Sequence, residues 1–424
     1  MSSPMLPTTR VQVSGHKFLR RRVEHGLIFG DIRMIHDPLR SRSRALIFGV
    51  VALVLTMLGA GLFAWMKPEA RPGEAPILAD ASGALYVHVD GRVFPVTNLA
   101  SARLIVGEAA DPARAGAEFF AGIEHGPLVG IPLAPGSIAE DFSALPAAWS
   151  VCSDAEQEVV VVGPAAPAPP RLSGDAALLV DAAGTQWLVT ADGRRELPTA
   201  DSADGRILRR NLGIGADTAL LAVPEQVLSG WTHRPAWALP SPLPTVLDAD
   251  GTWWARVDDS VTELTPTQAA ILLDAGAPRE TTTRAAAAGF RDGPPVNLPA
   301  TVPQLSSQPG YVCALGDGGA GVSETLPPKT VVPGITEVSA VAGMPGQAIA
   351  VDTGHERHII APTGVRYPIS EEGLVALGVA SVGKAPWSVV GLLPPGAELS
   401  ADRARRAVPL GEGDAPDGVV PDGL

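Results

Sequence analysis

One glycine-rich stretch has the spacing of a phosphate-binding loop. Gly378-Val-Ala-Ser-Val-Gly383-Lys384-Ala385 matches GxxxxGK, in which backbone amides and a lysine hold phosphate groups. Ala385 stands where a serine or threonine would bind magnesium, and the sequence predicts a helix before the loop and a strand, Trp387 to Leu393, after it. A phosphate-binding loop needs the opposite order, so Gly378, Gly383 and Lys384 are candidates only if the protein hydrolyses ATP.

A second stretch matches the dinucleotide pattern GxGxxG. Gly316-Asp-Gly318-Gly-Ala-Gly321 follows a predicted strand, but Pro327 and Pro328 prevent a helix from starting after it. A dinucleotide site needs the backbone amides of a helix N-terminus to bind phosphate, and none follows here. We therefore interpret this stretch as a turn.

Histidines and aspartates do not suggest a metal centre. His355 and His358 are three residues apart in a predicted hairpin, unlike the i, i+4 pair of HExxH. Asp248 and Asp250 begin like a calcium loop whose later ligands are missing, which favours a hairpin turn. The sequence contains no GxSxG, and we predict no catalytic residue, no cofactor and no metal.

An apolar segment divides the chain. Ala45 to Met66 contains no charged residue, and as a helix these 22 residues span about 33 Å, enough to cross a ~30 Å hydrocarbon layer. The segment and the 44 residues before it are both too long for a signal peptide, so we expect an uncleaved anchor. Arg40, Arg42 and Arg44 precede it directly, which places the N-terminus in the cytoplasm and the rest outside.

Charge is distributed unevenly about this segment. Residues 1–44 have a net charge of +6, whereas the residues after Met66 have −19, in a chain whose formal net charge is −13. An acidic outer part lacks the basic face that nucleic-acid binding needs. Gly 46 and Pro 41 favour short strands and turns over a helical bundle, so we predict a mixed α+β fold.

Residues 14–36 predict an amphipathic helix with a basic side. Such a helix can lie on anionic lipid or dock on the cytoplasmic part of a partner. Gly26 and Gly30 weaken it as an isolated helix, which favours docking. The residues that we expect to dock are Phe18, Leu19, Arg20, Arg21, Arg22 and Val23.

The two cysteines, Cys152 and Cys313, both follow the apolar segment. They are either separate buried thiols or a disulfide, and an even number in an exported region favours the disulfide. The segments that carry them are then candidates for the centre of the outer domain.

Two parts of the outer region share one order of elements. Both begin with a predicted hairpin and continue with an apolar helix that ends at a glycine, Gly107 or Gly378. Both then end with a strand that runs into Pro-Gly. Less similar copies lie between them, so we predict four small units that pack on neighbours or on a central piece.

A family resemblance is carried by two strings. The first string is VSGHKFLRRRVEHGLIFGDIRMIHDPLRSRSRAL, and after one membrane helix the second is GALYVHVDGRVFPVTNLASARLIVG. The chain resembles EccB, the single-span membrane component of actinobacterial type VII (ESX) secretion systems. The resemblance is close over the first ~140 residues. In the remaining residues it extends only to the order of features: repeats, a cysteine pair and a body rich in proline and glycine. It implies partners of the EccC (ATPase), EccD and EccE types, and the export of small helical proteins.

The predicted fold is a cytoplasmic amphipathic helix, one transmembrane helix, and an elongated extracytoplasmic domain of small repeated β-rich units around a disulfide-linked core. The predicted boundaries are 1–44 (basic head), 45–66 (transmembrane helix), 67–140 (first repeat), 141–175 (core segment), 176–245 (second repeat), 246–300 (third repeat), 301–345 (core segment), 346–400 (fourth repeat) and 401–424 (disordered acidic tail).

The favoured function is that of a non-enzymatic structural subunit of the secretion complex in the plasma membrane. It would associate with copies of itself through the outer domain and bind no nucleic acid. One alternative is an ATP-hydrolysing component of the same system. Another is a peptidoglycan-binding module, in which tryptophans stack on sugars; the candidates are Trp231, Trp237, Trp253, Trp254 and Trp387.

Overall fold

The computed structural model describes residues 9–30, 38–65, 73–142, 148–306, 309–334 and 336–409. The chain divides into two compact units, Met1–Ala70 and Arg71–Leu424. We call them the N-terminal unit and the outer unit, and describe each by itself.

Helix α1 (Arg10–Phe29) opens the N-terminal unit. Thr9 accepts a hydrogen bond from the Gln12 amide, and the Gln12 side chain accepts one from the Thr9 amide, a capping box that starts the helix before the predicted residue 14. The helix ends at Gly30 in the left-handed conformation, whereas residues 31–36 of the predicted helix lie outside the described residues.

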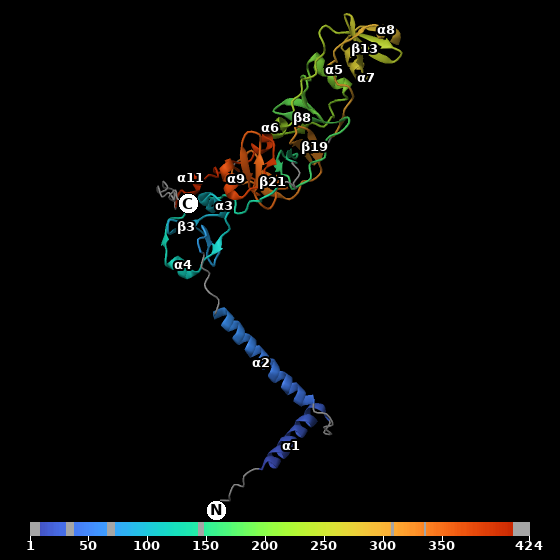
Figure 1. The fold of residues 1–424 in the computed structure, drawn as a ribbon. Coiled ribbons are helices and arrows are strands. Elements are labelled where there is room, and N and C mark those ends of the chain that lie inside the picture. Colours follow the sequence, from blue (N-terminus) through green and yellow to red (C-terminus); the bar gives the residue numbers. More distant parts are fainter. Residues whose placement is uncertain are drawn as a thin grey trace, which may run out of the picture. The chain divides into compact units, whose positions relative to one another are not determined.

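Helix α2 (Pro38–Trp65) follows (Figure 1), and its first residue is a proline. Its segment Arg44–Phe63 has a mean hydropathy of 2.5 and is long and apolar enough to cross a membrane, the one such helix among the described residues. Large side chains such as Leu46, Phe48 and Leu55 are exposed along it. The predicted transmembrane segment is therefore confirmed as helical through Trp65, and Met66 lies outside the described residues.

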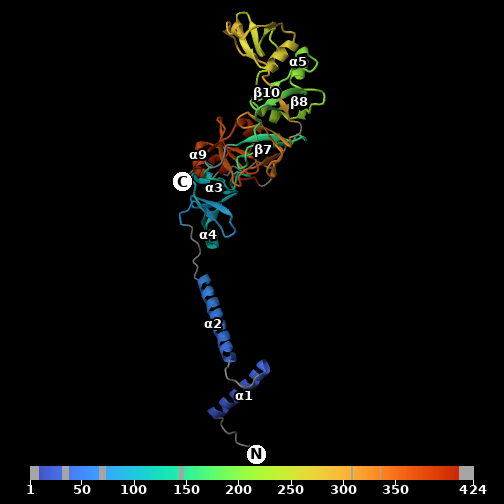
Figure 2. The same ribbon diagram turned by 90° about the vertical axis from the view of Figure 1, so that its right-hand side faces the viewer.

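In the described part of the outer unit, four of five sheets are built in one way (Figures 1 and 2). Three antiparallel strands are followed by a helix, and the next strand returns parallel to the first. In the first sheet the strand order is β4-β1-β2-β3-β5. Its elements are β1 (Ile77–Ala79), β2 (Leu85–Val89), β3 (Arg92–Val96), α3 (Leu99–Val106), β4 (Ala113–Arg114), α4 (Ala117–Ala121) and β5 (Glu124–His125).

The third sheet repeats this plan, with the order β15-β12-β13-β14-β16. Its elements are β12 (Thr245–Ala249), β13 (Thr252–Val257), β14 (Ser260–Leu264), α7 (Pro266–Asp274), β15 (Arg279–Thr281), α8 (Arg284–Ala287) and β16 (Arg291–Asp292). Asp250 and Gly251 form the predicted hairpin turn between β12 and β13, both with positive φ.

The second and fourth sheets have the orders β10-β9-β8-β11 and β24-β23-β22-β25. The elements of the second are β8 (Ala176–Ala182), β9 (Thr185–Thr190), β10 (Gly193–Glu196), α5 (Ala203–Asn211), β11 (Leu221–Ala222) and α6 (Glu225–Gly230), and β17 (Gln304–Leu305) also pairs with β8. Those of the fourth are β22 (Ile349–Asp352), β23 (Arg357–Ile360), β24 (Arg366–Pro368), α9 (Glu371–Leu377), β25 (Gly383–Lys384) and α10 (Trp387–Val390).

The fifth sheet, here the central sheet, joins two distant parts of the chain. Its strand order is β19-β18-β6-β7-β21-β20. The strands are β6 (Ser150–Ser153), β7 (Val159–Val162), β18 (Tyr311–Leu315), β19 (Ala320–Ser323), β20 (Lys329–Val331) and β21 (Ala340–Ala342). The two predicted core segments thus meet in one sheet.

Three hydrophobic clusters connect the sheets of the outer unit. One joins the first sheet and its helix α3, with Ile105, to the fourth sheet, with Ile359. A second joins the central sheet to the second and fourth sheets, and a third joins the second sheet to the third, with Leu208 and Ile271. Neighbouring sheets therefore bury their apolar faces against one another.

Three predicted features differ from the structure. Residues 387–390 form helix α10 and not a strand, because one helical turn after Pro386 buries Val389 and Val390 in the apolar cluster. The last strand predicted for the first unit, the stretch from Pro127 to Ile138 that contains Pro-Gly, is not formed, and these residues contain only single bridges, at Val129 and Ile138. Residues 401–409 are not a disordered tail, because helix α11 (Ala401–Ala404) buries Ala404 against the first sheet's cluster; the later residues lie outside the described range.

Candidate functional site

Helix α1 carries the residues predicted to dock. Arg20 pairs with Glu24 at 3.0 Å on the helix surface. Apolar side chains are also more than half exposed along α1: Val11, Phe18, Leu19, Val23, Leu27 and Ile28. An exposed set of apolar side chains on a basic helix is a surface that lipid or another protein can cover.

The GxxxxGK loop does not have the form of a phosphate cradle. Gly378, with φ of 78°, ends helix α9, and its amide donates to helix carbonyls. The amides of Ala380 and Ser381 both donate to the Glu140 carbonyl, at 2.8 and 3.3 Å. These backbone amides, which would have to donate to phosphate, thus already donate to carbonyl groups of the protein itself.

The second half of this loop is a strand. Gly383 and Lys384 form β25, which pairs in parallel with Val351 and Asp352 of β22, and the Ala385 amide donates to the Asp352 carbonyl. The predicted helix before the loop is confirmed, but the strand lies at Lys384 itself and helix α10 follows it.

The GxGxxG stretch is a hairpin turn, as predicted. It joins β18 to β19, and Gly318, with φ of 81°, donates to the Leu315 carbonyl at 2.8 Å. The Gly316 amide donates to the Trp149 carbonyl at 2.7 Å, so the amides of Gly316 and Gly318 are both bonded to carbonyls of the protein.

Cys152 and Cys313 form a disulfide at the middle of the central sheet. They are register partners on β6 and β18, their Cα atoms are 4.0 Å apart, and both side chains are fully buried. The predicted pairing is confirmed, and it closes a sequence separation of 161 residues that contains the second and third sheets.

The candidate tryptophans are mostly packed within the fold. Trp231 and Trp237 are buried, and Trp253 is covered by the guanidinium of Arg279, 5.0 Å from the ring centroid. Trp387 is 39% exposed but lies against His358 and Arg366. Sugar stacking needs an open ring face, which these contacts occupy in part.

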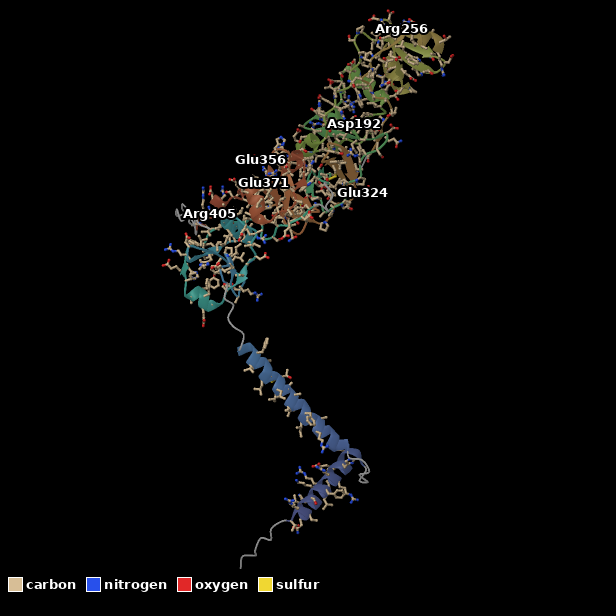
Figure 3. The ribbon with its side chains drawn as sticks, viewed as in Figure 1. Asp192, Arg256, Glu324, Glu356, Glu371 and Arg405 are labelled. Carbon is tan, nitrogen blue, oxygen red and sulfur yellow. A yellow bond between two sulfur atoms is a disulfide. The ribbon has the colours of Figure 1, made fainter. Side chains whose placement is uncertain are left out.

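His358 is a buried group that sequence reasoning did not single out as unusual. It lies on β23, two residues after the labelled Glu356 (Figure 3), is fully buried, and stacks on Trp387 with ring centroids 5.7 Å apart. Burial lowers the pKa of His358, and the nearby Arg366 guanidinium lowers that pKa further, against an opposite effect of Glu356. β23 has the sequence Arg-His-Ile-Ile, whose apolar residues are adjacent and do not alternate, so no pattern in the sequence indicated this burial.

We predict that this histidine makes stability depend on pH. Because the pKa of folded His358 is below the usual value of about 6.5, the unfolded chain binds more protons there. The stability that neutral, buried His358 contributes to the folded state is fully present above about pH 6.5, and it is lost as the pH falls toward the lowered pKa. Thermal unfolding between pH 8 and pH 5 should show a smaller acid loss for His358→Phe than for the wild type. A His355→Gln control, on the exposed turn, should behave like the wild type, and equal acid losses in all three proteins would refute the assignment.

Comparison with known proteins identifies the relatives of this chain. Residues 5–253 and 297–409 match the family described as type VII secretion system ESX-1, transport TM domain B. A protein from Mycolicibacterium smegmatis named ESX-1 secretion system ATPase EccB1 is 31% identical, over 94% of each chain. The chain belongs to the EccB family. Members of this family are membrane components of mycobacterial ESX type VII secretion systems.

Other EccB relatives agree in length and fold. A Mycobacterium tuberculosis protein named ESX-1 secretion system ATPase EccB1 is 29% identical, over 96% of this chain and 99% of that protein. A chain in the structure of an intact ESX-5 inner membrane complex superposes with a TM-score of 0.68 at 25% identity, covering 100% of this chain and 99% of that one. A chain of an EccB3 dimer from the ESX-3 core complex has the same fold, with a TM-score of 0.65 at 24% identity, covering 78% of this chain and 99% of that one.

Proposed function

We propose that this EccB protein is a structural subunit of an ESX inner membrane complex that exports proteins. One observation carries the proposal: a basic helix with exposed apolar residues precedes a single helix long enough to span a membrane, and the acidic outer unit follows it. The related chain in an intact ESX-5 inner membrane complex supports this role.

We propose the following placement for the parts of the chain. Helix α2 spans the inner membrane, α1 lies in the cytoplasm, and the outer unit lies on the periplasmic or cell-wall side. A chain of similar fold in the periplasmic assembly from the ESX-5 inner membrane complex supports the position of the outer unit. A disulfide in the outer unit is also consistent with an oxidising compartment.

The four sheets of common plan are proposed to be repeats, with boundaries near 67–140, 176–245, 246–300 and 346–400. Their shared strand order supports the division, and the central sheet supports core segments at 141–175 and 301–345. A domain of such units linked in series is proposed to be elongated and to associate with a second copy, as EccB3 from the ESX-3 core complex does in its dimer.

Partners of the EccC, EccD and EccE types are proposed to bind α1. Phe18, Leu19 and Val23 would enter apolar grooves while Arg20, Arg21 and Arg22 meet acidic groups. The exposure of the three apolar side chains, at 54, 59 and 61%, supports docking, because burial on a partner removes this surface from water.

Reversing the charge of the basic run tests this docking. We expect replacement of Arg20, Arg21 and Arg22 by Glu to reduce recovery of the partner proteins from detergent extracts at least tenfold, because like charges would then face the acidic groups. The measurement is affinity purification of the tagged chain followed by quantitative mass spectrometry. Arg10→Glu, at the start of the same helix, is the control and should retain the partners. Unchanged recovery with the triple variant would refute docking through this run.

ATP hydrolysis is the alternative that the names of the relatives suggest. In this chain the amides of Ala380, Ser381 and Ala385 are bonded to backbone carbonyls, and position 385 has no hydroxyl for magnesium. These observations favour the structural role over a nucleotide site at Lys384.

A further inference from the structure

Strand β20 forms an open edge of the central sheet. The strand order places it at the end of the sheet, beside β21, which Figure 1 labels. All three of its residues, Lys329 to Val331, are exposed. The Val331 side chain is 79% exposed, which leaves an apolar group in water. A strand edge of this kind offers unpaired amides and carbonyls to another strand.

The opposite edge of the sheet is closed by the chain itself. Residues 170–172 run along β19. The Leu172 amide donates to the Ala320 carbonyl at 2.9 Å, and the Val322 amide donates to the Pro170 carbonyl, also at 2.9 Å. Within the part of the chain that the structure describes, the central sheet therefore has its one open edge at β20.

The backbone of β20 directs part of its polar groups outward. The Val332 amide donates to the Ser339 carbonyl at 3.1 Å, and in an antiparallel pair alternate residues bond to the same neighbour. Thr330, two residues earlier, therefore bonds to β21 as well. The amides and carbonyls of Lys329 and Val331 face away from the sheet, at equal distances on either side of Thr330.

The charge that normally protects an edge strand is neutralised in β20. A lysine on an edge discourages pairing with another chain, because it brings an uncompensated charge into the contact. The Lys329 ammonium, however, forms an ion pair with Glu158 of its own chain, and the two side chains are 33 and 32% exposed. Two copies of β20 can therefore meet without repulsion between free ammonium groups.

We propose that β20 pairs with β20 of a second copy of this chain, antiparallel about a two-fold axis that passes beside Thr330. This inference rests on the self-association proposed above and assigns a surface to it. Lys329 of each copy would lie opposite Val331 of the other, and the two pairs would form four hydrogen bonds, which use every outward group of the strand. Each exposed valine would pack against the alkyl part of the opposite lysine.

Two features favour a second copy over a different peptide as the occupant. The outward groups are symmetric about Thr330, so a strand of the same sequence satisfies all of them, and Pro333 has no amide proton to extend the pairing. Because the β19 edge is closed, two copies joined through β20 leave no free edge of the central sheet. The assembly therefore ends at a dimer and does not extend into a fibre.

Cysteine cross-linking of the full-length protein in detergent tests the proposed register. The Cα atoms of the two Thr330 residues would lie about 4.5 Å apart, a distance that a disulfide can bridge. We expect Thr330→Cys to form a covalent dimer under mild oxidation, seen on non-reducing gels. Lys329→Cys should remain mostly monomeric, because its two copies would lie about 8 Å apart across the axis. Ser323→Cys, on the closed edge, should also remain monomeric.

Light scattering of the same samples separates this inference from self-association in general. Absence of a covalent dimer for Thr330→Cys in a protein that scatters as a dimer would overturn the pairing but not self-association, whereas a monomeric protein would refute both. Equal cross-linking of all three variants would also overturn the pairing. So would cross-linking of Thr330→Cys to a different protein, in place of the second copy, when intact membranes are oxidised.

A proline substitution measures how much the pairing contributes to the dimer. Val331→Pro removes an outward amide from each copy, and with it two hydrogen bonds from the dimer, so it should raise the dissociation constant at least tenfold. Val331→Thr keeps the amide and the β-branched shape and should leave the dissociation constant unchanged. Thermal unfolding checks that both variants fold. Equal dissociation constants for the two folded variants would overturn the proposal.

Discussion

Removal of the disulfide should cause the largest loss of stability in this protein. Replacing both Cys152 and Cys313 by Ala is expected to lower the free energy of unfolding by about 5 kcal/mol, because the bridge closes a loop of 161 residues that is otherwise free in the unfolded chain. The measurement is urea denaturation of the full-length protein, followed by tryptophan fluorescence. The midpoint should fall strongly, and dithiothreitol should have the same effect on the wild type.

A neighbouring substitution serves as the control for this experiment. Ser150 lies on the same strand, is buried, and its hydroxyl is 3.9 Å from the Cys152 sulfur. Ser150→Ala removes a weak contact and leaves the bridge intact, so its effect should be about 1 kcal/mol or less. A double cysteine variant as stable as Ser150→Ala would show that the bridge does not hold the central sheet.

Trp231→Ala should have the second-largest effect. Trp231 is 2% exposed in the cluster that joins the central sheet to its neighbours, and its indole nitrogen donates to the Cys313 carbonyl at 3.0 Å. Truncation removes a large buried side chain and the hydrogen bond, which predicts a loss of about 3–5 kcal/mol. Urea denaturation followed by circular dichroism measures it without depending on the removed fluorophore.

The other tryptophans provide the comparison. Trp231→Phe keeps most of the buried ring and loses the hydrogen bond, so it should cost about 1–3 kcal/mol. Trp387→Ala, at a half-exposed position, should cost less than Trp231→Ala. Equal losses for Trp231→Ala and Trp387→Ala would refute a central role for Trp231.

Local patterns in the sequence predicted several elements well. The apolar helix that was predicted to end at Gly107 is α3 (Leu99–Val106), which Asn98 caps and Gly107 ends in the left-handed conformation. The uncharged segment predicted helix α2 in the same way. These features depend on residues close together in the chain, which a sequence displays directly.

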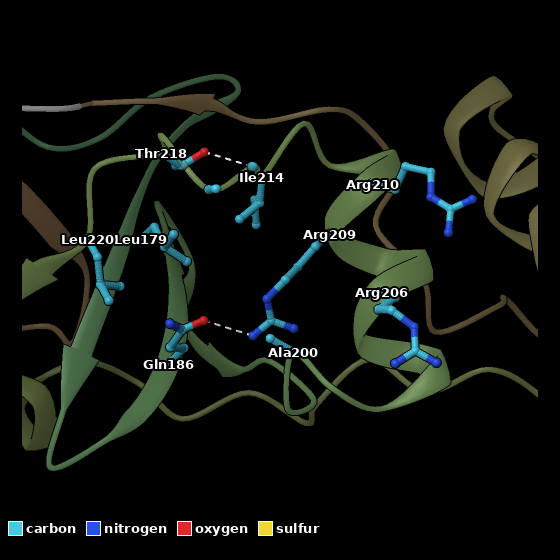
Figure 4. Close-up of a pocket in the computed structure, with 11 residues that line it drawn as sticks. Leu179, Gln186, Ala200, Arg206, Arg209, Arg210, Ile214, Thr218 and Leu220 are labelled. Atoms are coloured by element: carbon cyan, nitrogen blue, oxygen red, sulfur yellow. Dashed lines mark hydrogen bonds between the residues drawn. The ribbon is translucent and has the colours of Figure 1, made fainter.

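Features that depend on distant contacts were harder to predict. The valines of α10 favour a strand by their type, but packing of Val389 and Val390 in the apolar cluster selects a helical turn. The GxxxxGK pattern similarly does not reveal that Glu140 accepts from two of its amides. A cavity beside α5 is lined by residues that include Gln186, Arg209 and Leu220 (Figure 4), whose proximity no local spacing indicates.

The central claim, that α1 and the outer unit lie on opposite sides of one membrane, can be tested by cysteine labelling. Ser14 of α1 and Ser229 of α6 are matched sites, because both are exposed and each hydroxyl donates to a carbonyl in the preceding helical turn. The native cysteines are paired in the disulfide and should not react. In spheroplasts, a membrane-impermeant maleimide should label Ser229→Cys at once and Ser14→Cys only after the membrane is permeabilised. Labelling of both sites before permeabilisation, or of Ser14→Cys alone, would contradict the account.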